Sequence, residues 1–235
     1  MAPVNPRTVL GLYGVVGAMN VFCVATSLSI PATAAKVLLM PLLLVWLLLT
    51  VSGGCTPRSA VRWLAVGMLL AWFGDILLTQ DSDAFFAAGL SSFLVMQVCY
   101  VVAFLRIPGP GLVRAWKVAI VPFLVVYVVI NLLISDGVGA LRIPVLVYSA
   151  ALMVMALAAL DLVLRVPRPL GWRIAAGSVL FLVSDALIAL TAFGPLTQSP
   201  AWSAVIMTTY IAAQAMIVTG FGSAVTHGTS AAVTR

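Results

Sequence analysis

Residues 61–79 read VRWLAVGMLLAWFGDILLT, and residues 173–193 read RIAAGSVLFLVSDALIALTAF. Each stretch is long and apolar enough to cross a membrane as a helix, because about 20 apolar residues span the hydrocarbon core. Each also contains one internal aspartate, Asp75 in the first and Asp185 in the second. An ionisable group at membrane depth is costly, so both are candidates for a functional site. Together they suggest acid–base chemistry by a carboxylate pair inside the bilayer.

The rest of the chain is equally apolar. Of its 235 residues 63% are hydrophobic and only 8% are charged, whereas soluble domains contain roughly 25% charged residues. We therefore predict an all-α fold, a polytopic membrane helical bundle that forms one integral membrane domain over residues 1–235, with a polar tail at 226–235. Eight transmembrane helices are expected, at about 8–27, 35–52, 60–79, 84–105, 115–134, 142–164, 172–193 and 201–223.

The net charge of +6 reflects topology rather than nucleic-acid binding. The loops on one side, with both termini, contain most of the basic residues: Arg7, Arg58, Arg62, Arg106, Arg114, Lys117, Arg165, Arg168, Arg173 and Arg235. The other side has Lys36 and Arg142 with Asp81, Asp83 and Asp136. This positive-inside pattern predicts a multi-pass protein of the cell membrane with both termini cytoplasmic. We expect membrane lipid and no nucleic acid as partner.

Metal ligands are scarce in this sequence. It has no glutamate, and its one histidine, His227, lies in the polar tail. Its three cysteines, Cys23, Cys55 and Cys99, show no CxxC spacing and suggest no disulfide framework. A site built from histidine and carboxylates is therefore poorly supplied, and we predict no metal and no cofactor.

An internal repeat relates the two aspartates. When residues 58–104 are laid on 168–214 without gaps, Arg58 falls on Arg168, Gly67 on Gly177, Asp75 on Asp185 and Tyr100 on Tyr210. With four spans in each half, the halves have the same orientation, so we predict two parallel four-helix repeats at about 1–110 and 111–225. Small residues near each aspartate allow close helix contact. If spans 60–79 and 172–193 approach along them, both aspartates face a shared cavity.

Other polar side chains lie at depth in the predicted spans. Lys36 opens the second span and is either a snorkelling lysine or a counter-charge for a carboxylate or phosphate. Asp161, four residues before Arg165, is expected to form a surface ion pair. Interhelical hydrogen bonding is the simplest role for the remaining mid-span group: Asn20, Gln97, Gln214, Tyr100 and Tyr210.

Four segments resemble the YhhN-like lysoplasmalogenase family: 73–78 (FGDILL), 89–100 (GLSSFLVMQVCY), 177–187 (GSVLFLVSDAL) and 210–217 (YIAAQAMI). They occur in the right order and extend over most of the chain. The resemblance implies an eight-span hydrolase that cleaves the vinyl ether bond of lysoplasmalogens. The products would be a fatty aldehyde and a glycerophosphoethanolamine or glycerophosphocholine.

The resemblance also implies site residues. Asp75 and Asp185 would be the catalytic acid–base pair, and the substrate-binding candidates are Lys36, Tyr100, Tyr210, Gln214, Gln97 and Asn20. The chain departs from the family pattern at two positions. Gln97 stands where the family often has histidine, which puts the substrate and the rate in question. Val37 stands where proline often follows the lysine, with Pro41 further on.

Vinyl ether hydrolysis begins with protonation of the carbon β to oxygen, which gives an oxocarbenium ion that water attacks. The reaction needs an acid, an anion near the developing cation and a held water molecule. Two neighbouring carboxyls that share one proton supply the acid and the anion, as in aspartic dyads. No metal or organic cofactor is required.

Three other hypotheses fit parts of the sequence. A small-solute or proton-coupled transporter would also have repeats and buried aspartates, although such transporters usually show inverted repeats and broken helices. An intramembrane aspartyl protease also uses two aspartates, but the similarity ends at Gly74–Asp75. In a third hypothesis the two aspartates have a purely structural role and hold helices together. The sequence is compatible with a homo-oligomer as well as with a single chain.

Overall fold

In the computed structural model, which describes residues 5–55, 57–80 and 82–233, every regular element is a helix. Within those ranges, seven helical segments are long and apolar enough to cross a membrane. They are built on α1 (Pro6–Ala25), α2 (Ser29–Val51), α3 (Arg58–Leu77), α4 (Asp83–Leu105), α7 (Arg142–Asp161), α8 (Arg168–Ala192) and α9 (Pro200–Val233). The predicted polytopic helical bundle is thus confirmed, and the chain is a multi-pass membrane protein.

The predicted fifth span, 115–134, is shorter and less regular than expected. The short helix α5 (Leu112–Ala115) is followed by the 3-10 turn η1 (Lys117–Ile120) and then by α6 (Val121–Leu133). Together η1 and α6 form an apolar helix over Lys117–Leu133. Because Pro122 has no N–H to donate to the preceding turn, the α-helix α6 begins only at Val121, beside this proline. Two further 3-10 turns, η2 (Gly139–Leu141) and η3 (Leu162–Leu164), flank α7.

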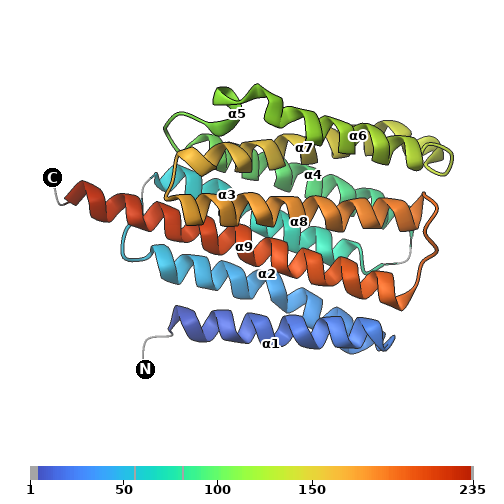
Figure 1. Cartoon of the computed structure of the whole chain (residues 1–235). Coiled ribbons are helices and arrows are strands. Elements are labelled where there is room, and N and C mark those ends of the chain that lie inside the picture. The colour runs from blue at the N-terminus through green and yellow to red at the C-terminus, as the bar shows by residue number, and fades with distance from the viewer. Residues whose placement is uncertain (1–4, 56, 81, 234–235) are drawn as a thin grey trace.

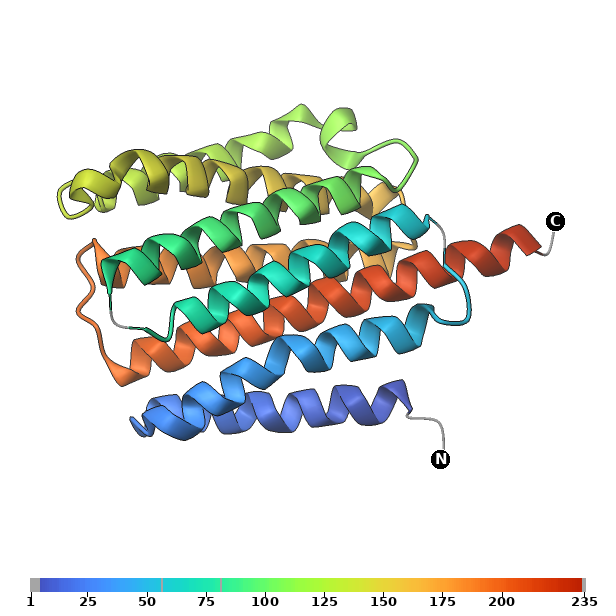
Figure 2. The same ribbon diagram turned by 180° about the vertical axis from the view of Figure 1, so that it is seen from behind.

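The long helices run side by side and alternate in direction (Figure 1). Helices α1 and α2 lie at one side of the bundle and α6 and α7 at the other, and Figures 1 and 2 show the α3–α4 and α8–α9 pairs between them. The start of α1 and the end of α9 lie at the same end. Asp81, Arg235 and the side chain of His227 are outside the described residues.

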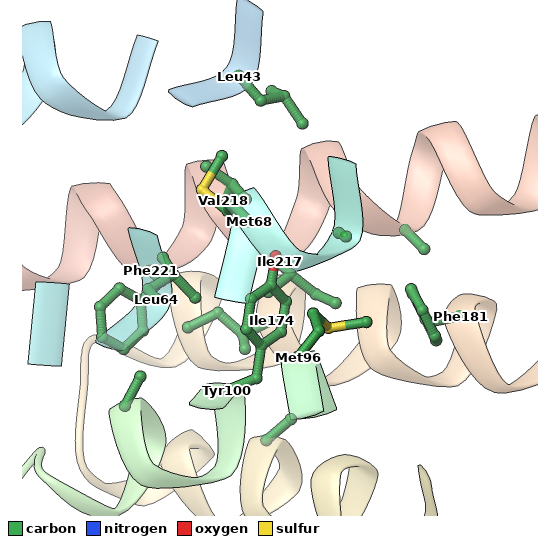
Figure 3. Packing of buried hydrophobic residues seen from close by; sticks show 14 of the residues in the cluster. Leu43, Leu64, Met68, Met96, Tyr100, Ile174, Phe181, Ile217, Val218 and Phe221 are labelled. Atoms are coloured by element: carbon green, nitrogen blue, oxygen red, sulfur yellow. The ribbon is translucent and has the colours of Figure 1, made fainter. Parts of the chain in front are cut away.

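Small residues hold α3 to α4 and α8 to α9. A Cβ on Gly67 would lie 2.6 Å from the ring of Tyr100 on α4, and one on Gly177 would lie 2.9 Å from the carbonyl of Ala213 on α9. Large apolar side chains of these helices fill the centre of the bundle (Figure 3). The considered approach of α3 and α8 along these glycines is therefore not what forms, because Gly67 packs on α4 and Gly177 packs on α9.

The ion pair between Asp161 and Arg165 forms, but it is buried rather than superficial. The two side chains are only 9% and 4% exposed. Asp161 also accepts a hydrogen bond from the backbone N–H of Val113, at 2.8 Å, and Gly111 packs directly on its carboxyl group. The pair therefore attaches the segment before α6 to the end of α7. The sequence could not predict this role, because it does not give the position of the 111–113 segment.

Candidate active site

A partly open cavity lies in the bundle, and both Asp75 and Asp185 line it; the space not filled by atoms, its open mouth included, is about 1060 Å³. Its walls come from α2, α3, α4, α6, α7, α8 and α9. Most of the lining is apolar, with Leu152, Met153 and Leu182 among the buried side chains. An apolar lining with a few polar groups suits a small amphiphilic ligand. The shared cavity predicted for the two aspartates is therefore present.

The two aspartates lie at matching places on their helices. Asp75 follows the first residue of α3, Arg58, by 17 residues, and Asp185 follows the first residue of α8, Arg168, by the same 17. At 1.5 Å per residue this is about 25 Å along each axis, well beyond the middle of a bilayer. The cavity thus lies toward the end of the bundle opposite the start of α1 and the end of α9.

Asp75 has two strong partners. Its Oδ1 lies 3.4 Å from Nζ of Lys36 on α2, and its Oδ2 accepts a hydrogen bond of 2.6 Å from the Tyr210 hydroxyl on α9. The Tyr210 ring is fixed by aromatic contacts with Phe93 and Phe181, at centroid distances of 6.2 and 5.9 Å. With an exposed fraction of 2%, Asp75 is a buried carboxylate held by a cation and a phenol from two other helices.

Asp185 has a different environment. Its Oδ2 accepts a hydrogen bond of 2.5 Å from the Tyr148 hydroxyl on α7, and the residue is less buried than Asp75. Within the described ranges no cation lies within ion-pair distance of Asp185, and no hydrogen bond joins the two carboxyl groups. The aspartates therefore share a cavity, but the expected direct sharing of one proton is not what the geometry shows.

Pro41 and Trp72 position Lys36 against Asp75. Because proline has no N–H, Pro41 cannot donate to the carbonyl of Val37, one turn earlier in α2. The indole N–H of Trp72 on α3 donates to that carbonyl instead, at 2.8 Å. Val37 directly follows Lys36, and Trp72 precedes Asp75 by three residues. The bond therefore ties α2 to α3 within one turn of the ion pair.

Trp72→Phe should lower the free energy of unfolding by about 1–3 kcal/mol, because the Val37 carbonyl then has no hydrogen-bond donor. Restoring an N–H through Pro41→Ala should remove most of this cost, so the double variant should lose less than the sum of the two single changes. Denaturant titration of the purified protein in detergent would measure the three differences in free energy of unfolding.

The matched control is Trp63→Phe, the same change on the same helix at a side chain that is 37% exposed and forms no hydrogen bond within the described residues. It should change stability by less than about 0.5 kcal/mol. Equal losses at Trp63 and Trp72, or full additivity with Pro41→Ala, would show that the indole hydrogen bond has no special role.

The structure brings four of the eight proposed site residues together at the cavity: Asp75, Asp185, Lys36 and Tyr210. The other four lie outside its lining. Tyr100 donates to Gln214 at 2.9 Å, and Asn20 donates to the Ala32 carbonyl at 2.7 Å, so each ties two helices together. Gln97 is fully buried without a hydrogen-bond partner among the described residues. These four side chains do not line the cavity, and their role in substrate binding stays a prediction.

Tyr148 is the functional candidate that the sequence analysis missed, together with Asn131 and Ser149, which also line the cavity. The repeat pointed to Tyr100 as the counterpart of Tyr210, but Asp185 bonds to Tyr148 from α7 instead. The depth of Tyr148 in the membrane could have pointed to this residue, since it lies six residues after the first residue of α7, which is at the outer end of the bundle.

In the described part of the chain no three His, Cys, Asp or Glu side chains group as metal ligands.

Comparison with known proteins gives one match. The model of the YhhN family matches residues 32–221, which includes α3, α4, α7, α8 and all the polar side chains of the cavity. No curated protein and no solved structure matches the chain.

Proposed function

Because the chain belongs to the YhhN family, we propose that it is an intramembrane hydrolase that cleaves the vinyl ether bond of lysoplasmalogens. The products are a fatty aldehyde and a glycerophosphoethanolamine or glycerophosphocholine. The observation that carries the proposal is the apolar cavity that contains both Asp75 and Asp185. A lysophospholipid has one chain for the apolar walls and one polar end for the few polar groups. No metal or organic cofactor takes part in the proposed steps.

The environments of the two carboxyls support different roles. Lys36 lies beside Asp75 and favours its ionised form, so Asp75 is a poor proton donor. Among the described residues Asp185 has the Tyr148 hydroxyl as its one hydrogen-bond partner, and it is less buried than Asp75. A carboxyl group without a cation in an apolar cavity favours its neutral form. We therefore assign Asp185 as the general acid and Asp75 as the fixed anion.

The reaction then proceeds in balanced steps. Asp185 donates its proton to the β carbon, the double-bond electrons form the new C–H bond, and an oxocarbenium ion develops on the α carbon. The fixed Asp75 carboxylate, which lines the same cavity, stabilises this cation. Water adds to the α carbon and returns a proton to a carboxylate. The hemiacetal loses its hydroxyl proton, the bond to the glycerol oxygen breaks, and that oxygen takes up a proton.

The orientation in the membrane supports access from the outer leaflet. Most basic residues fall near the end of the bundle where α1 starts and α9 ends, which points to a cytoplasmic location for that end in a cell membrane. The cavity lies toward the opposite end. A lysoplasmalogen of the outer leaflet would then have its vinyl ether, next to the headgroup, at the depth of the carboxyls.

Aldehyde release by the purified protein tests the proposal. We expect aldehyde from a lysoplasmalogen and none from the saturated ether of the same chain and headgroup, because a saturated ether has no double bond to protonate. A wild-type protein that binds both lipids and releases no aldehyde would overturn the assigned reaction. Substrate-driven flux in liposomes without product would favour the transporter instead.

A further inference from the structure

A second hollow adjoins the cavity at the outer end of the bundle. It has about 630 Å³ of space not filled by atoms, and Arg142, the first residue of α7, lies in its lining. Four residues line both spaces, so the two are neighbours along one wall of the bundle: Tyr127, Asn131, Ile134 and Val145. A ligand in the cavity could therefore extend toward Arg142.

In the part of the chain that the structure describes, Arg142 is a basic side chain at this end without an ionic partner. Only Lys36 and Arg142 lie near the outer side in the sequence, and Lys36 is paired with Asp75. Arg142 is exposed and has no ion pair or hydrogen bond within residues 5–55, 57–80 and 82–233. Among the described residues, no acidic side chain lines the hollow. An arginine there suits a phosphate group, which its planar guanidinium binds through two parallel hydrogen bonds.

The spacing along α7 fits one lysophospholipid. Arg142, Val145 and Ser149 recur at intervals of three and four residues, so they share a helix face that runs from the hollow into the cavity. Tyr148, which holds Asp185, lies six residues after Arg142, a rise of about 9 Å. Five single bonds of about 1.5 Å separate the ether oxygen of a lysoplasmalogen from phosphorus, or roughly 6 Å when extended. The flexible arginine side chain closes the remaining distance.

We propose that Arg142 binds the phosphate group of the lysophospholipid while its vinyl ether lies at Asp185. This inference rests on the proposed function and names the part of the site that recognises the headgroup. It also assigns Lys36 to Asp75 rather than to the lipid phosphate. The hydrophobic chain then extends along the apolar walls toward the centre of the bilayer.

Binding of non-cleavable lipids tests the site without turnover. The probes are the saturated-ether lysophosphatidylcholine and the alkylglycerol of the same chain, which lacks the phosphate, each titrated calorimetrically into the purified protein in detergent. Arg142→Gln should weaken binding of the phospholipid about tenfold or more and leave the alkylglycerol unchanged. Arg142→Lys should fall between, since lysine keeps the charge but loses the bidentate geometry.

Arg114→Gln is the matched control, because Arg114 is an exposed arginine on α5 at the other end of the bundle. It should leave both affinities unchanged. Inorganic phosphate and glycerophosphocholine serve as competitors that test whether the site binds a lipid or a free anion. Neither should displace the phospholipid at matched concentration.

Equal effects of Arg142→Gln on both probes, no effect on either, or displacement by inorganic phosphate would each overturn the lipid phosphate site. Aldehyde release does not enter this measurement. A failed hydrolysis assay would therefore overturn the reaction alone, whereas phosphate-independent binding would overturn the site alone.

Discussion

The Asp185→Asn variant is expected to release aldehyde about 10²–10⁴-fold more slowly than the wild type, the range typical of general acid–base catalysis. Asparagine is close in size to aspartate and can still accept the hydrogen bond from Tyr148, but it has no proton to give to the β carbon. The loss should therefore appear in kcat, with little change in affinity for the saturated ether analogue. Steady-state aldehyde release together with calorimetric binding of that analogue would measure both quantities.

Asp83→Asn provides the matched control, since Asp83 is exposed in the first turn of α4 and does not line the cavity. It should turn over at close to the wild-type rate. If Asp185→Asn retained more than about a tenth of that rate, Asp185 would not be the acid, because a tenfold change corresponds to only about 1.4 kcal/mol of barrier. Asp75→Asn with a larger loss than Asp185→Asn would reverse the two roles.

The helices of this protein could be predicted from sequence because hydropathy and length determine a membrane span. The span expected at 84–105, for example, is α4 at Asp83–Leu105. The least accurate prediction was 115–134, where Trp116 has a non-helical backbone and the α-helix begins only at Val121, beside Pro122. Hydropathy shows that such a segment is apolar, but it does not show whether the backbone forms one continuous α-helix.

The shared cavity could also be predicted, since an aspartate at the same place in each half must be near its counterpart or face lipid at high cost. The partners of the aspartates could not. Lys36 was equally compatible with snorkelling and with pairing, and only the packing of α2 on α3 decides between them. Tyr148 approaches from α7, where no sequence spacing relates it to Asp185.

The predicted polar set divides in the structure, since some of its side chains line the cavity and others bond to another helix. Mid-span amides and phenols look alike in sequence whether they bind a ligand or another helix. Tyr100 and Tyr210 fall on the same repeat offset, yet Tyr210 bonds to Asp75 while Tyr100 bonds to Gln214, outside the cavity. Matching residue types at one sequence offset therefore do not ensure matching side-chain partners.

Lys36→Met should be the most destabilising change at the site, costing about 3–5 kcal/mol, because it leaves a buried carboxylate without its cation. The Asp75 side chain is only 3% exposed, whereas the Lys36 side chain is 18% exposed. Asp75→Asn should therefore cost less, since the freed lysine can extend its ammonium toward the interface. Denaturant titration of the two variants in detergent would reveal this asymmetry.

The double variant Lys36→Met with Asp75→Asn separates charge from packing. Removing both charges leaves no buried ion unpaired, so the double variant should be more stable than Lys36→Met alone although it contains one more substitution. Lys117→Met, at an exposed lysine in η1, controls for the gain of methionine and should be nearly neutral. A double variant no more stable than Lys36→Met would mean that the ion pair does not set the stability of this region. Aldehyde release should stay lost in the double variant, because restored stability does not replace the fixed anion beside the reacting lipid.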